Sequence, residues 1–332
     1  MRSRFPVVFG LLLLAISSLQ NPQRCSADEK AEQKPLKVEK PFLWKVEAPS
    51  KGDATPAVSW FFGTIHVPDQ GITTLHPAAQ KAFDDAHAAY FEIDFMKASS
   101  AQMESISLPA EKKLEDLIPE ELVKRLDERL AKISPLAKRT ALPNAHPGVW
   151  PLLLGNLDAQ LRKLGQLPLD MLLYSTAVQQ EKVVGGLEKA TGQLQGIIDL
   201  PVEEQAAFLK ATLDGMDEDE AAGIDRIRET MELYTSGDEA KFEKFINEEF
   251  DRIKLDKDIA DRITTALLGD RNRHMAEAAD ALMKDNPDKS YFFAVGLGHL
   301  VGKDKVQEFL ESRGYKITRV TDAPASENTD AR

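Results

Sequence analysis

Cysteine is almost absent from this chain: Cys25 is the only one among 332 residues. It lies in an N-terminal segment that we expect to be removed, so the remaining chain would contain no cysteine and could form no disulfide bond. Its stability must then come from a hydrophobic core, and about 300 residues are ample for one large domain or two small ones.

Long apolar runs are missing beyond the first residues. Residues 5–16 form an apolar run that follows two arginines and is too short to span a bilayer as a mature helix. We interpret residues 1–27 as a secretory signal peptide, with Cys25 and Ala27 at the small-residue positions of the cleavage site. The alternative, a lipoprotein acylated at Cys25, is weaker because residues 22–24 are Pro-Gln-Arg, where small and apolar residues are expected.

Positive charge is also scarce, with 42 lysines and arginines against 54 acidic residues and a net charge of −12. Removal of the signal peptide takes away three arginines, which brings the net charge to −15. This acidic balance argues against a nucleic-acid partner. No later stretch approaches 18 uninterrupted apolar residues, so we expect an exported, periplasmic or extracellular protein that is not an integral membrane protein after signal cleavage. Its oligomeric state does not follow from the sequence.

Three common catalytic signatures are absent as well. The sequence contains no HExxH, no GxSxG and, after removal of the signal peptide, no cysteine nucleophile. A thermolysin-like zinc protease, a serine hydrolase with a nucleophile elbow and a cysteine hydrolase are therefore excluded at the level of motifs.

What is present indicates one domain between two irregular ends. Residues 28–40 are charged and have no apolar period, as in a flexible leader. The tail, residues 323–332, is expected to be disordered. The domain itself would cover residues 41–322.

Strand patterns lie at both ends of this domain and helical patterns lie between them. Residues 41–48 and 57–67 predict a hairpin with a long loop, and a helical pattern then leads into a short alternating strand over residues 89–95. The middle is helical apart from a strand near residues 181–188.

After a long helical run over residues 256–287, strand patterns return near residues 290–300 and 315–321, with a helix ending at Gly314 between them. We predict an α/β or α+β fold with a mixed central sheet built from the N- and C-terminal thirds, over which the helices pack as a cap.

Two histidines stand in the same local pattern. Gly63-Thr64-Ile65-His66 and Gly296-Leu297-Gly298-His299 each follow an aromatic strand, so each histidine would project from a strand end, where open α/β sheets place their sites. For either histidine alone, a hydrogen-bonded turn or core residue is the simpler interpretation.

A carboxylate in the short strand strengthens the pairing of these motifs. Glu92 lies between two apolar residues, and Asp94 would share its face of the strand. Glu92 could equally lie on a solvent-facing edge. If His66, His299 and Glu92 meet, two imidazoles and a carboxylate form a plausible site for a divalent metal such as Zn, Mn, Co or Fe. His76, His87 and His274 fall on helix starts or faces and are expected to be structural or exposed.

Five segments, in order, resemble the TraB/GumN family, which includes the Tiki proteases and the PrgY pheromone-shutdown proteins and is distantly similar to erythromycin-esterase and ChaN-type folds. They are LWKV with SWFFGTIHVPD, AAYFEIDF, VVGGLE, LLGDRNRHMAEAADALM and YFFAVGLGHLVGKDKVQEFLESRGYKITRV. Together they extend over residues 41–320.

The resemblance implies metal or catalytic roles for His66, His299 and Glu92. The Arg-Asn pair that the family has in its long helix corresponds to Arg271 and Asn272. Arg271 could hold a carboxylate or a polarised carbonyl through two hydrogen bonds. Alternatively, it could form an ion pair between helices. Glu188 matches a recurrent family position without a defined role. Where the family often has a Lys-Pro-Trp turn this chain has AHPGVW, so His146 and Trp150 receive no functional assignment.

The leading hypothesis is an exported metal-dependent hydrolase of Tiki-like type that cleaves a peptide or a related amide or ester bond. The metal would be held by His66 and His299, with Glu92 as third ligand or general base and with Arg271 in support. The alternative is a non-catalytic protein that sequesters a peptide or small molecule, as the pheromone-shutdown relatives suggest. Haem or iron binding follows only from the distant ChaN similarity.

Overall fold

The computed structural model describes residues 38–49, 56–67, 74–135, 137–142, 144–162, 166–252 and 254–322. The predicted signal peptide and tail lie outside the described residues, as does the leader up to residue 37, and all three stay predictions. Within the described ranges, no helix is long and apolar enough to cross a membrane.

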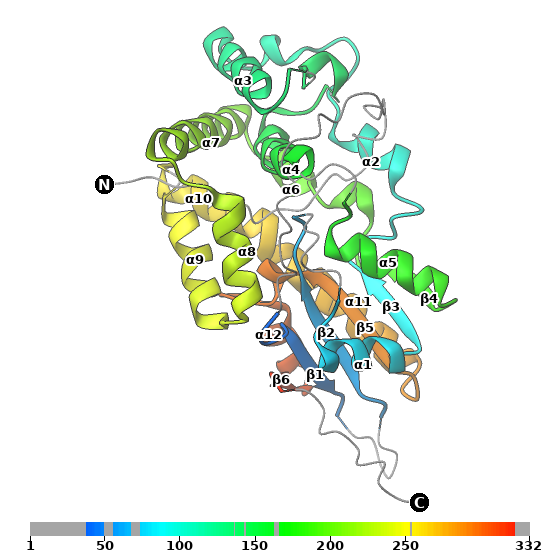
Figure 1. Cartoon of the computed structure of the whole chain (residues 1–332). Coiled ribbons are helices and arrows are strands. Elements are labelled where there is room, and N and C mark those ends of the chain that lie inside the picture. Colours follow the sequence, from blue (N-terminus) through cyan, green and yellow to red (C-terminus); the bar gives the residue numbers. More distant parts are fainter. Residues whose placement is uncertain are drawn as a thin grey trace, which may run out of the picture.

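A mixed sheet of six strands forms the base of the molecule (Figure 1). In spatial order the strands are β4 Val183–Gly186, β3 Ala88–Phe91, β5 Tyr291–Gly296, β2 Ser59–Thr64, β1 Leu43–Glu47 and β6 Lys316–Val320. Neighbours from β4 to β2 run parallel, whereas β1 runs antiparallel to both β2 and β6. Five of the strands come from the N- and C-terminal thirds, and the short β4 from the helical middle adds one edge, which confirms the predicted mixed sheet.

The central strands are rich in aromatic residues because both of their faces are covered. All six residues of β5 are buried. Phe61 stacks on Phe293 with ring centroids 4.8 Å apart, and Phe62 lies 5.6 Å from Phe292 on the other face.

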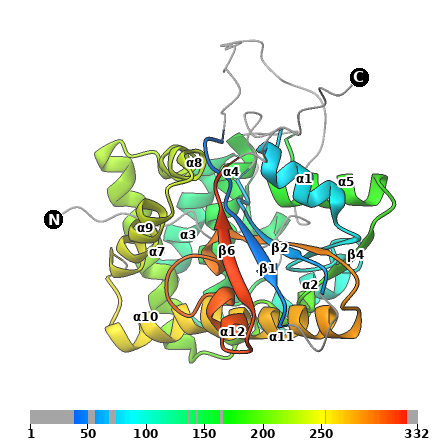
Figure 2. The ribbon, with the colours of Figure 1, turned by 90° about the horizontal axis from the view of Figure 1, so that it is seen from below.

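Helices cover the two faces of the sheet (Figure 2). On one face lie α1 Pro77–Asp85, whose Phe83 meets Phe292 edge-on, and α5 Leu169–Gln179, whose Tyr174 meets Phe91. The opposite side carries α11 Asp270–Asp285 and α12 Val306–Glu311. Two further helices, α8 Arg226–Ser236 and α9 Glu239–Arg252, contribute to the same core as the sheet.

The rest of the helical middle forms a cap with a hydrophobic core of its own, and Figure 1 shows it above the sheet. Its helices are α2 Ser99–Ile106, α3 Glu120–Ile133, α4 Trp150–Arg162, α6 Gln195–Ile198, α7 Val202–Ala222 and α10 Lys257–Thr264. Short 3-10 turns lie at Leu114–Asp116, Arg139–Ala141, Pro147–Val149, Ala190–Gly192 and Leu297–His299. The predicted cap is thereby confirmed.

One local prediction needs correction, and another gains a detail. The strand expected over residues 89–95 ends at Phe91, so Glu92 follows β3 and Asp94 does not share a strand face with it. Asp94 instead accepts a hydrogen bond from the Tyr174 hydroxyl at 2.7 Å. The long helical run is continuous but contains a π-helical segment, Thr265–Gly269, between α10 and α11. Such insertions shift the register of the side chains that follow.

Candidate active site

The predicted site residues lie at the carboxyl ends of three neighbouring parallel strands. His66 follows β2, Glu92 follows β3, and His299 closes the 3-10 turn after β5. Parallel strands end at the same edge of a sheet, so their following residues meet there. All three side chains are largely enclosed, with exposed fractions of 12% for His66, 7% for Glu92 and 5% for His299.

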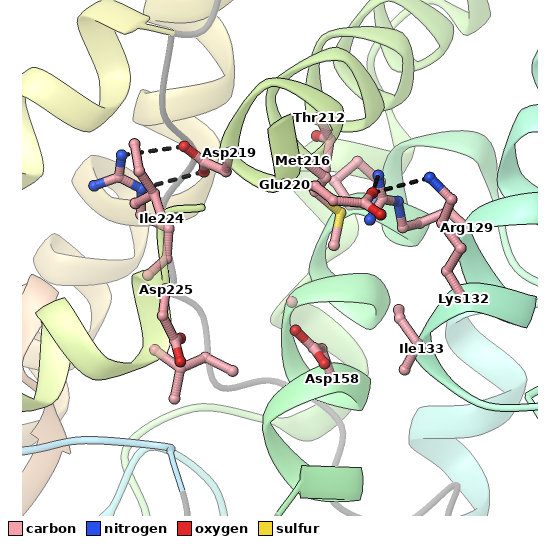
Figure 3. A pocket seen from close by; sticks show the side chains of 14 residues that line it. Arg129, Lys132, Ile133, Asp158, Thr212, Met216, Asp219, Glu220, Ile224 and Asp225 are labelled. Atoms are coloured by element: carbon pink, nitrogen blue, oxygen red, sulfur yellow. Dashed lines mark hydrogen bonds and ion pairs between the residues drawn. The ribbon is translucent and has the colours of Figure 1, made fainter. Parts of the chain in front are cut away.

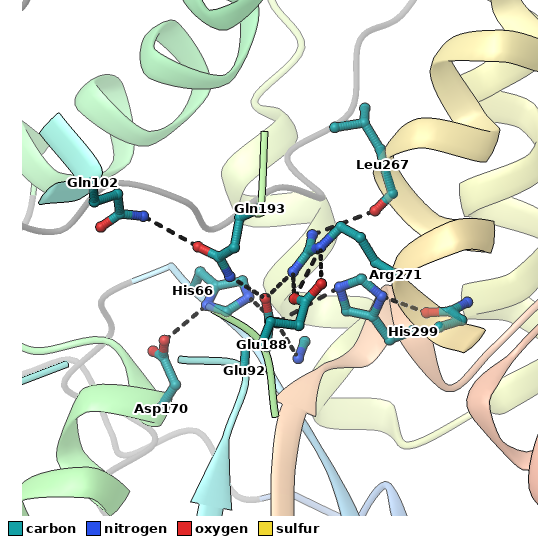
Figure 4. A network of polar contacts seen from close by, with 11 residues as sticks. His66, Glu92, Gln102, Asp170, Glu188, Gln193, Leu267, Arg271 and His299 are labelled. Atoms are coloured by element: carbon teal, nitrogen blue, oxygen red, sulfur yellow. Dashed lines mark hydrogen bonds and ion pairs between the residues drawn. The ribbon is translucent and has the colours of Figure 1, made fainter. Parts of the chain in front are cut away.

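Both imidazoles face one carboxylate oxygen (Figure 4). The Nε2 atom of His66 lies 3.4 Å from Oε1 of Glu92, and the Nε2 atom of His299 lies 3.7 Å from the same oxygen. The structure therefore brings together the three residues that the sequence proposed as metal ligands. Their function as ligands stays a prediction.

The other ring nitrogen of each histidine is held by an oxygen from a helix. Nδ1 of His66 lies 2.9 Å from Oδ2 of Asp170 in α5, and Nδ1 of His299 lies 2.6 Å from Oδ1 of Asn272 in α11. Asn272 is itself oriented, because its amide nitrogen donates to the carbonyl of Asp304 at 2.8 Å. Since both partner atoms accept hydrogen bonds, each Nδ1 carries the hydrogen, and a neutral ring then presents Nε2 as an acceptor.

Arg271 and two amide groups orient the carboxylate of Glu92. Its Oε2 atom accepts hydrogen bonds from Nη2 of Arg271 at 2.6 Å and from the Gln193 amide at 3.4 Å, while Oε1 accepts the N–H of Gly296 at 2.8 Å. The amide of Gln102, in α2 of the cap, donates to Gln193 at 3.1 Å. The cap thus reaches the site through a pair of buried glutamines.

Arg271 also binds Glu188, through Nε at 3.1 Å and Nη2 at 2.7 Å. One guanidinium therefore ties α11 to the segments that follow β3 and β4. The partners of Arg271 are thus two carboxylates that follow strands, not a residue of another helix, and its catalytic role stays a prediction.

Burial and charge together shift the ionisation of these groups. Burial by itself would lower the pKa of His66, but Asp170 and Glu92 outweigh it and raise that pKa to about 10. Burial and the nearby Arg271 lower the pKa of His299 to about 3. Burial would raise the pKa of Glu92, yet His299, Arg271 and His66 hold it well below 4.5. The two carboxylates beside His66 therefore favour its protonated form.

The two glycines that begin the histidine motifs make room for different neighbours. A Cβ atom on Gly296 would lie 2.7 Å from Nε2 of His66 and 2.9 Å from Oε1 of Glu92. A Cβ atom on Gly63 would instead lie 2.7 Å from the end of the Leu297 side chain and 3.1 Å from Cβ of Phe42. Gly296 thus leaves open the space that the imidazole and the carboxylate share, whereas Gly63 allows close packing.

Sequence reasoning missed Asp170, Gln193 and Gln102. Asp170 is 4% exposed and lies in the first turn of α5, where an acidic residue is ordinary for electrostatic reasons. Its Oδ1 atom is buried and has no hydrogen-bond partner among the residues that the structure describes. No pattern in the sequence separates such a residue from a simple helix-start aspartate.

The remaining histidines do not join the site. His76 accepts the N–H of Ala78 at the start of α1, and His87 and His274 are exposed, as expected. His146 precedes the 3-10 turn Pro147–Val149, and Trp150 is buried in the cap.

Carboxylates outnumber cationic side chains at the site, so its net charge would attract a cation. Of the three carboxylates at the site, Glu92 and Glu188 pair with the guanidinium of Arg271, and Asp170 pairs with the imidazole of His66. In the part of the chain that the structure describes, however, no group of three His, Cys, Asp or Glu side chains is already arranged as a metal site.

Fold and site together define a capped α/β protein with a histidine and carboxylate site at the carboxyl edge of its sheet. Residues 42–319 match the sequence profile of the TraB/PrgY/gumN family, and the chain belongs to this family. The resemblance noted in the sequence is thereby confirmed.

Several curated relatives are metalloproteases by name. Metalloprotease TIKI2 of Xenopus tropicalis is 28% identical over 316 residues, which cover 83% of this chain and 59% of the relative. Metalloprotease TIKI1 of Homo sapiens is 27% identical over 316 residues, covering 83% of this chain and 61% of the relative. The chain thus spans about three fifths of their length. No solved structure matches the chain significantly.

Proposed function

We propose that this protein is an exported metal-dependent hydrolase that cleaves a peptide bond or a related amide or ester bond. The observation that carries the proposal is the convergence of two imidazole Nε2 atoms on one oxygen of Glu92. Similarity to proteins named metalloproteases supports the same reaction class.

The donor set fits a divalent ion held by His66, His299 and Glu92. Two ligand atoms that each lie ~2.1 Å from one ion are roughly 3 to 4 Å apart, and the two nitrogens lie 3.4 and 3.7 Å from Oε1. A divalent ion would replace the proton on His66 and offset the excess of carboxylates. Nitrogen and carboxylate ligands suit Zn, Mn, Co or Fe, so the donors leave the choice among these metals open.

When bound, such an ion supplies a Lewis acid that polarises the scissile carbonyl and makes a water molecule more acidic. The chain's own residues prepare this position. Asp170 and Asn272 hold the imidazoles with Nε2 facing inward, and Arg271 binds Oε2 of Glu92 so that Oε1 faces them.

Of the two roles considered for Glu92, its surroundings favour the ligand role. A carboxylate whose pKa is held well below 4.5 is a weak proton acceptor. The Oε1 atom of Glu92, by contrast, faces the Nε2 atoms of both histidines, as a ligand atom would. Substrate would approach from the side of His66, which is the most exposed of the three side chains.

The test begins with the metal content of the purified mature protein, measured by mass spectrometry before and after chelation. We expect close to one divalent ion per chain. We also expect the protein to cleave members of a peptide library, to lose this activity on chelation and to regain it with one of the four metals. His66→Ala and His299→Ala should lose both properties and keep the fold, whereas the exposed His274→Ala serves as the matched control.

Two results would contradict the proposal. Tight peptide binding without turnover under any metal would support the sequestering alternative instead. Unchanged turnover in both histidine variants would show that the chemistry lies elsewhere. Export is checked separately, because sequencing of the exported form should begin near Asp28.

A further inference from the structure

The two glutamines that connect the cap with the candidate active site are buried almost completely. Gln193 is 2% exposed and Gln102 is 4% exposed. The Gln102 side chain donates to Oε1 of Gln193 at 3.1 Å, and Nε2 of Gln193 donates in turn to Oε2 of Glu92 at 3.4 Å (Figure 4). Two consecutive hydrogen bonds therefore lead from the cap to the carboxylate that both histidines face.

Gln193 belongs to the cap, whereas Glu92 belongs to the sheet. The next residue, Leu194, is part of the hydrophobic core of the cap. Gly196 brings the same segment close to the π-helical segment, since a Cβ atom on Gly196 would lie 2.9 Å from Cβ of Ala266. Glu92 directly follows β3. The position of the Gln193 amide relative to Glu92 therefore depends on how the cap lies on the sheet.

The boundary between the two hydrophobic cores is not completely filled. A cavity of about 310 Å³ lies between α3, α4, α7 and the start of α8 (Figure 3). It is lined by Ile133, Gly155 and Met216 from the cap, and by Ile227, which packs on the core of the sheet. Atoms that line a void lack packing partners on that side. This boundary therefore holds the cap less firmly than a continuous core would, and polar contacts across it gain importance.

Arg271 holds Glu188 more firmly than it holds Glu92. Its Nε and Nη2 atoms both donate to Glu188, at 3.1 and 2.7 Å, whereas only Nη2 donates to Glu92, at 2.6 Å. Burial raises the pKa of Glu188 and the charge of Glu92 adds to this rise, while Arg271 and the Gln193 side chain oppose it. Gln193 thus supplies a second donor to Oε2 of Glu92, which otherwise would follow a guanidinium that Glu188 controls.

Gln102 decides which end of the Gln193 amide faces Glu92. An amide group has a donor end and an acceptor end, so a partner that occupies one end turns the other end away from itself. Gln102 donates to the carbonyl end of Gln193 and thereby turns its NH2 group toward the carboxylate.

We propose that Gln193 is a positioning residue that keeps Glu92 directed at the two histidines while the cap is seated on the sheet, and that Gln102 fixes the direction of its amide. This role rests on the proposed function, because Gln193 helps to orient the carboxylate that would bind the metal ion. A displacement of the cap would then loosen Glu92 and weaken the hold of the site on the ion.

The backbone N–H of Gly296 reports the orientation of Glu92 without any metal, because it donates to Oε1 at 2.8 Å. Its signal is followed by NMR in chelator-treated protein labelled with ¹⁵N-glycine, and the signal that Gly296→Ala removes assigns it. Loss of this hydrogen bond moves the amide proton to higher field and speeds its exchange with solvent. Affinity for a divalent ion is measured separately, by competition with a chelator.

Gln193→Met keeps the length of the side chain and removes its amide. We expect the Gly296 proton to move to higher field and to exchange about tenfold faster, and the ion to bind about tenfold more weakly. Gln102→Met should act in the same direction by about threefold, because Gln193 stays in place without a fixed direction. Gln102→Glu should act more strongly than Gln102→Met, since the new carboxylate attracts the NH2 group of Gln193 away from Glu92.

Gln205→Met is the matched control, because Gln205 is a buried glutamine of α7 whose hydrogen bonds lie within the cap. It accepts the N–H of Gly148 at 3.1 Å and donates to the carbonyls of Ile198 and Leu200 at 2.9 and 2.8 Å. Loss of these bonds should lower stability in urea, whereas the Gly296 signal and the ion affinity should stay near those of the wild type.

Three results would overturn the proposal. The first is an unchanged Gly296 signal in Gln193→Met, and the second is an equally large change in Gln205→Met. The third is a Gln102→Met effect that persists at full size in the Gln193→Met background, where the two hydrogen bonds are already broken. If Gln193→Met fails to fold, the two Gln102 variants carry the same test. A wild-type protein that binds no divalent ion would contradict the proposed function, and the Gly296 signal would still decide the role of Gln193.

Discussion

Replacement of Gly296 by alanine is the sharpest test of the site, because one methyl group would enter the space that His66 and Glu92 share. The added Cβ atom would lie 2.7 Å from Nε2 of His66 and 2.9 Å from Oε1 of Glu92. Carbon atoms in contact are usually about 3.5 Å from their neighbours, so these groups must separate by roughly 0.6 to 0.8 Å.

The consequence should be larger for function than for stability. Overpacking of a well-packed interior costs about 1 to 3 kcal/mol, whereas a displacement of about 1 Å in a catalytic site can cost about a hundredfold in rate. We therefore expect Gly296→Ala to lose about a hundredfold in turnover and to bind metal more weakly. Backbone strain does not contribute to this loss, because alanine readily adopts the φ of −53° found at Gly296.

Gly63→Ala is the matched control from the other histidine motif. Its Cβ atom would meet the flexible end of Leu297 and Cβ of Phe42 rather than a site residue. We expect a similar loss of stability, about 1 to 3 kcal/mol in urea unfolding, with metal affinity near that of the wild type. Metal affinity is measured by competition with a chelator. If Gly296→Ala kept the turnover and metal affinity of the wild type, the space in front of Gly296 would not be the centre of the site.

Three further predictions concern the residues around the site. Arg271→Lys keeps the charge but loses the planar guanidinium that joins Glu92 to α11. Turnover should therefore fall about a hundredfold, with only a small change in melting temperature. A lower melting temperature with unchanged turnover would make Arg271 a structural residue only. Asp170→Asn should lower the pKa of His66 in NMR titrations and weaken metal binding by about 10- to 100-fold, and an unchanged metal affinity would contradict the orienting role. Burial would raise the pKa of Asp94, but its hydrogen bonds, including that from Tyr174, hold it below 3.8. Tyr174→Phe should therefore cost about 1 kcal/mol in urea unfolding at pH 7 and less as the pH falls below about 4, where the folded carboxylate becomes protonated; a cost that does not depend on pH would refute this linkage.

The strands were predictable because their signals are local. β5 carries aromatic and β-branched residues at consecutive positions, as a strand buried on both faces requires, and β1 and β2 are separated by turn-forming residues. The end of β3 was not predictable to the residue, because apolar residues continue on both sides of Glu92 while pairing in the sheet stops at Phe91.

The meeting of His66, Glu92 and His299 could be anticipated from sequence and a general rule of sheet geometry. Each follows a strand, and the carboxyl ends of parallel strands share one edge. The order of the strands was beyond the sequence: β5, from the C-terminal third, inserts between β3 and β2 and places His299 beside residues that are distant along the chain.

By itself the sequence determined the class of fold, the strand ends that bear the site and the membership of the family, because hydrophobic periodicity, turn residues and motif order are properties of consecutive residues. Only the tertiary structure decided the partners of the imidazoles. Asp170 and Asn272 arrive on helices that lie on opposite sides of the sheet, so their contacts depend on how α5 and α11 pack. The clearance in front of Gly296 and the cavity beside Gly155 likewise arise from surfaces that meet only after the cap and the sheet have packed together.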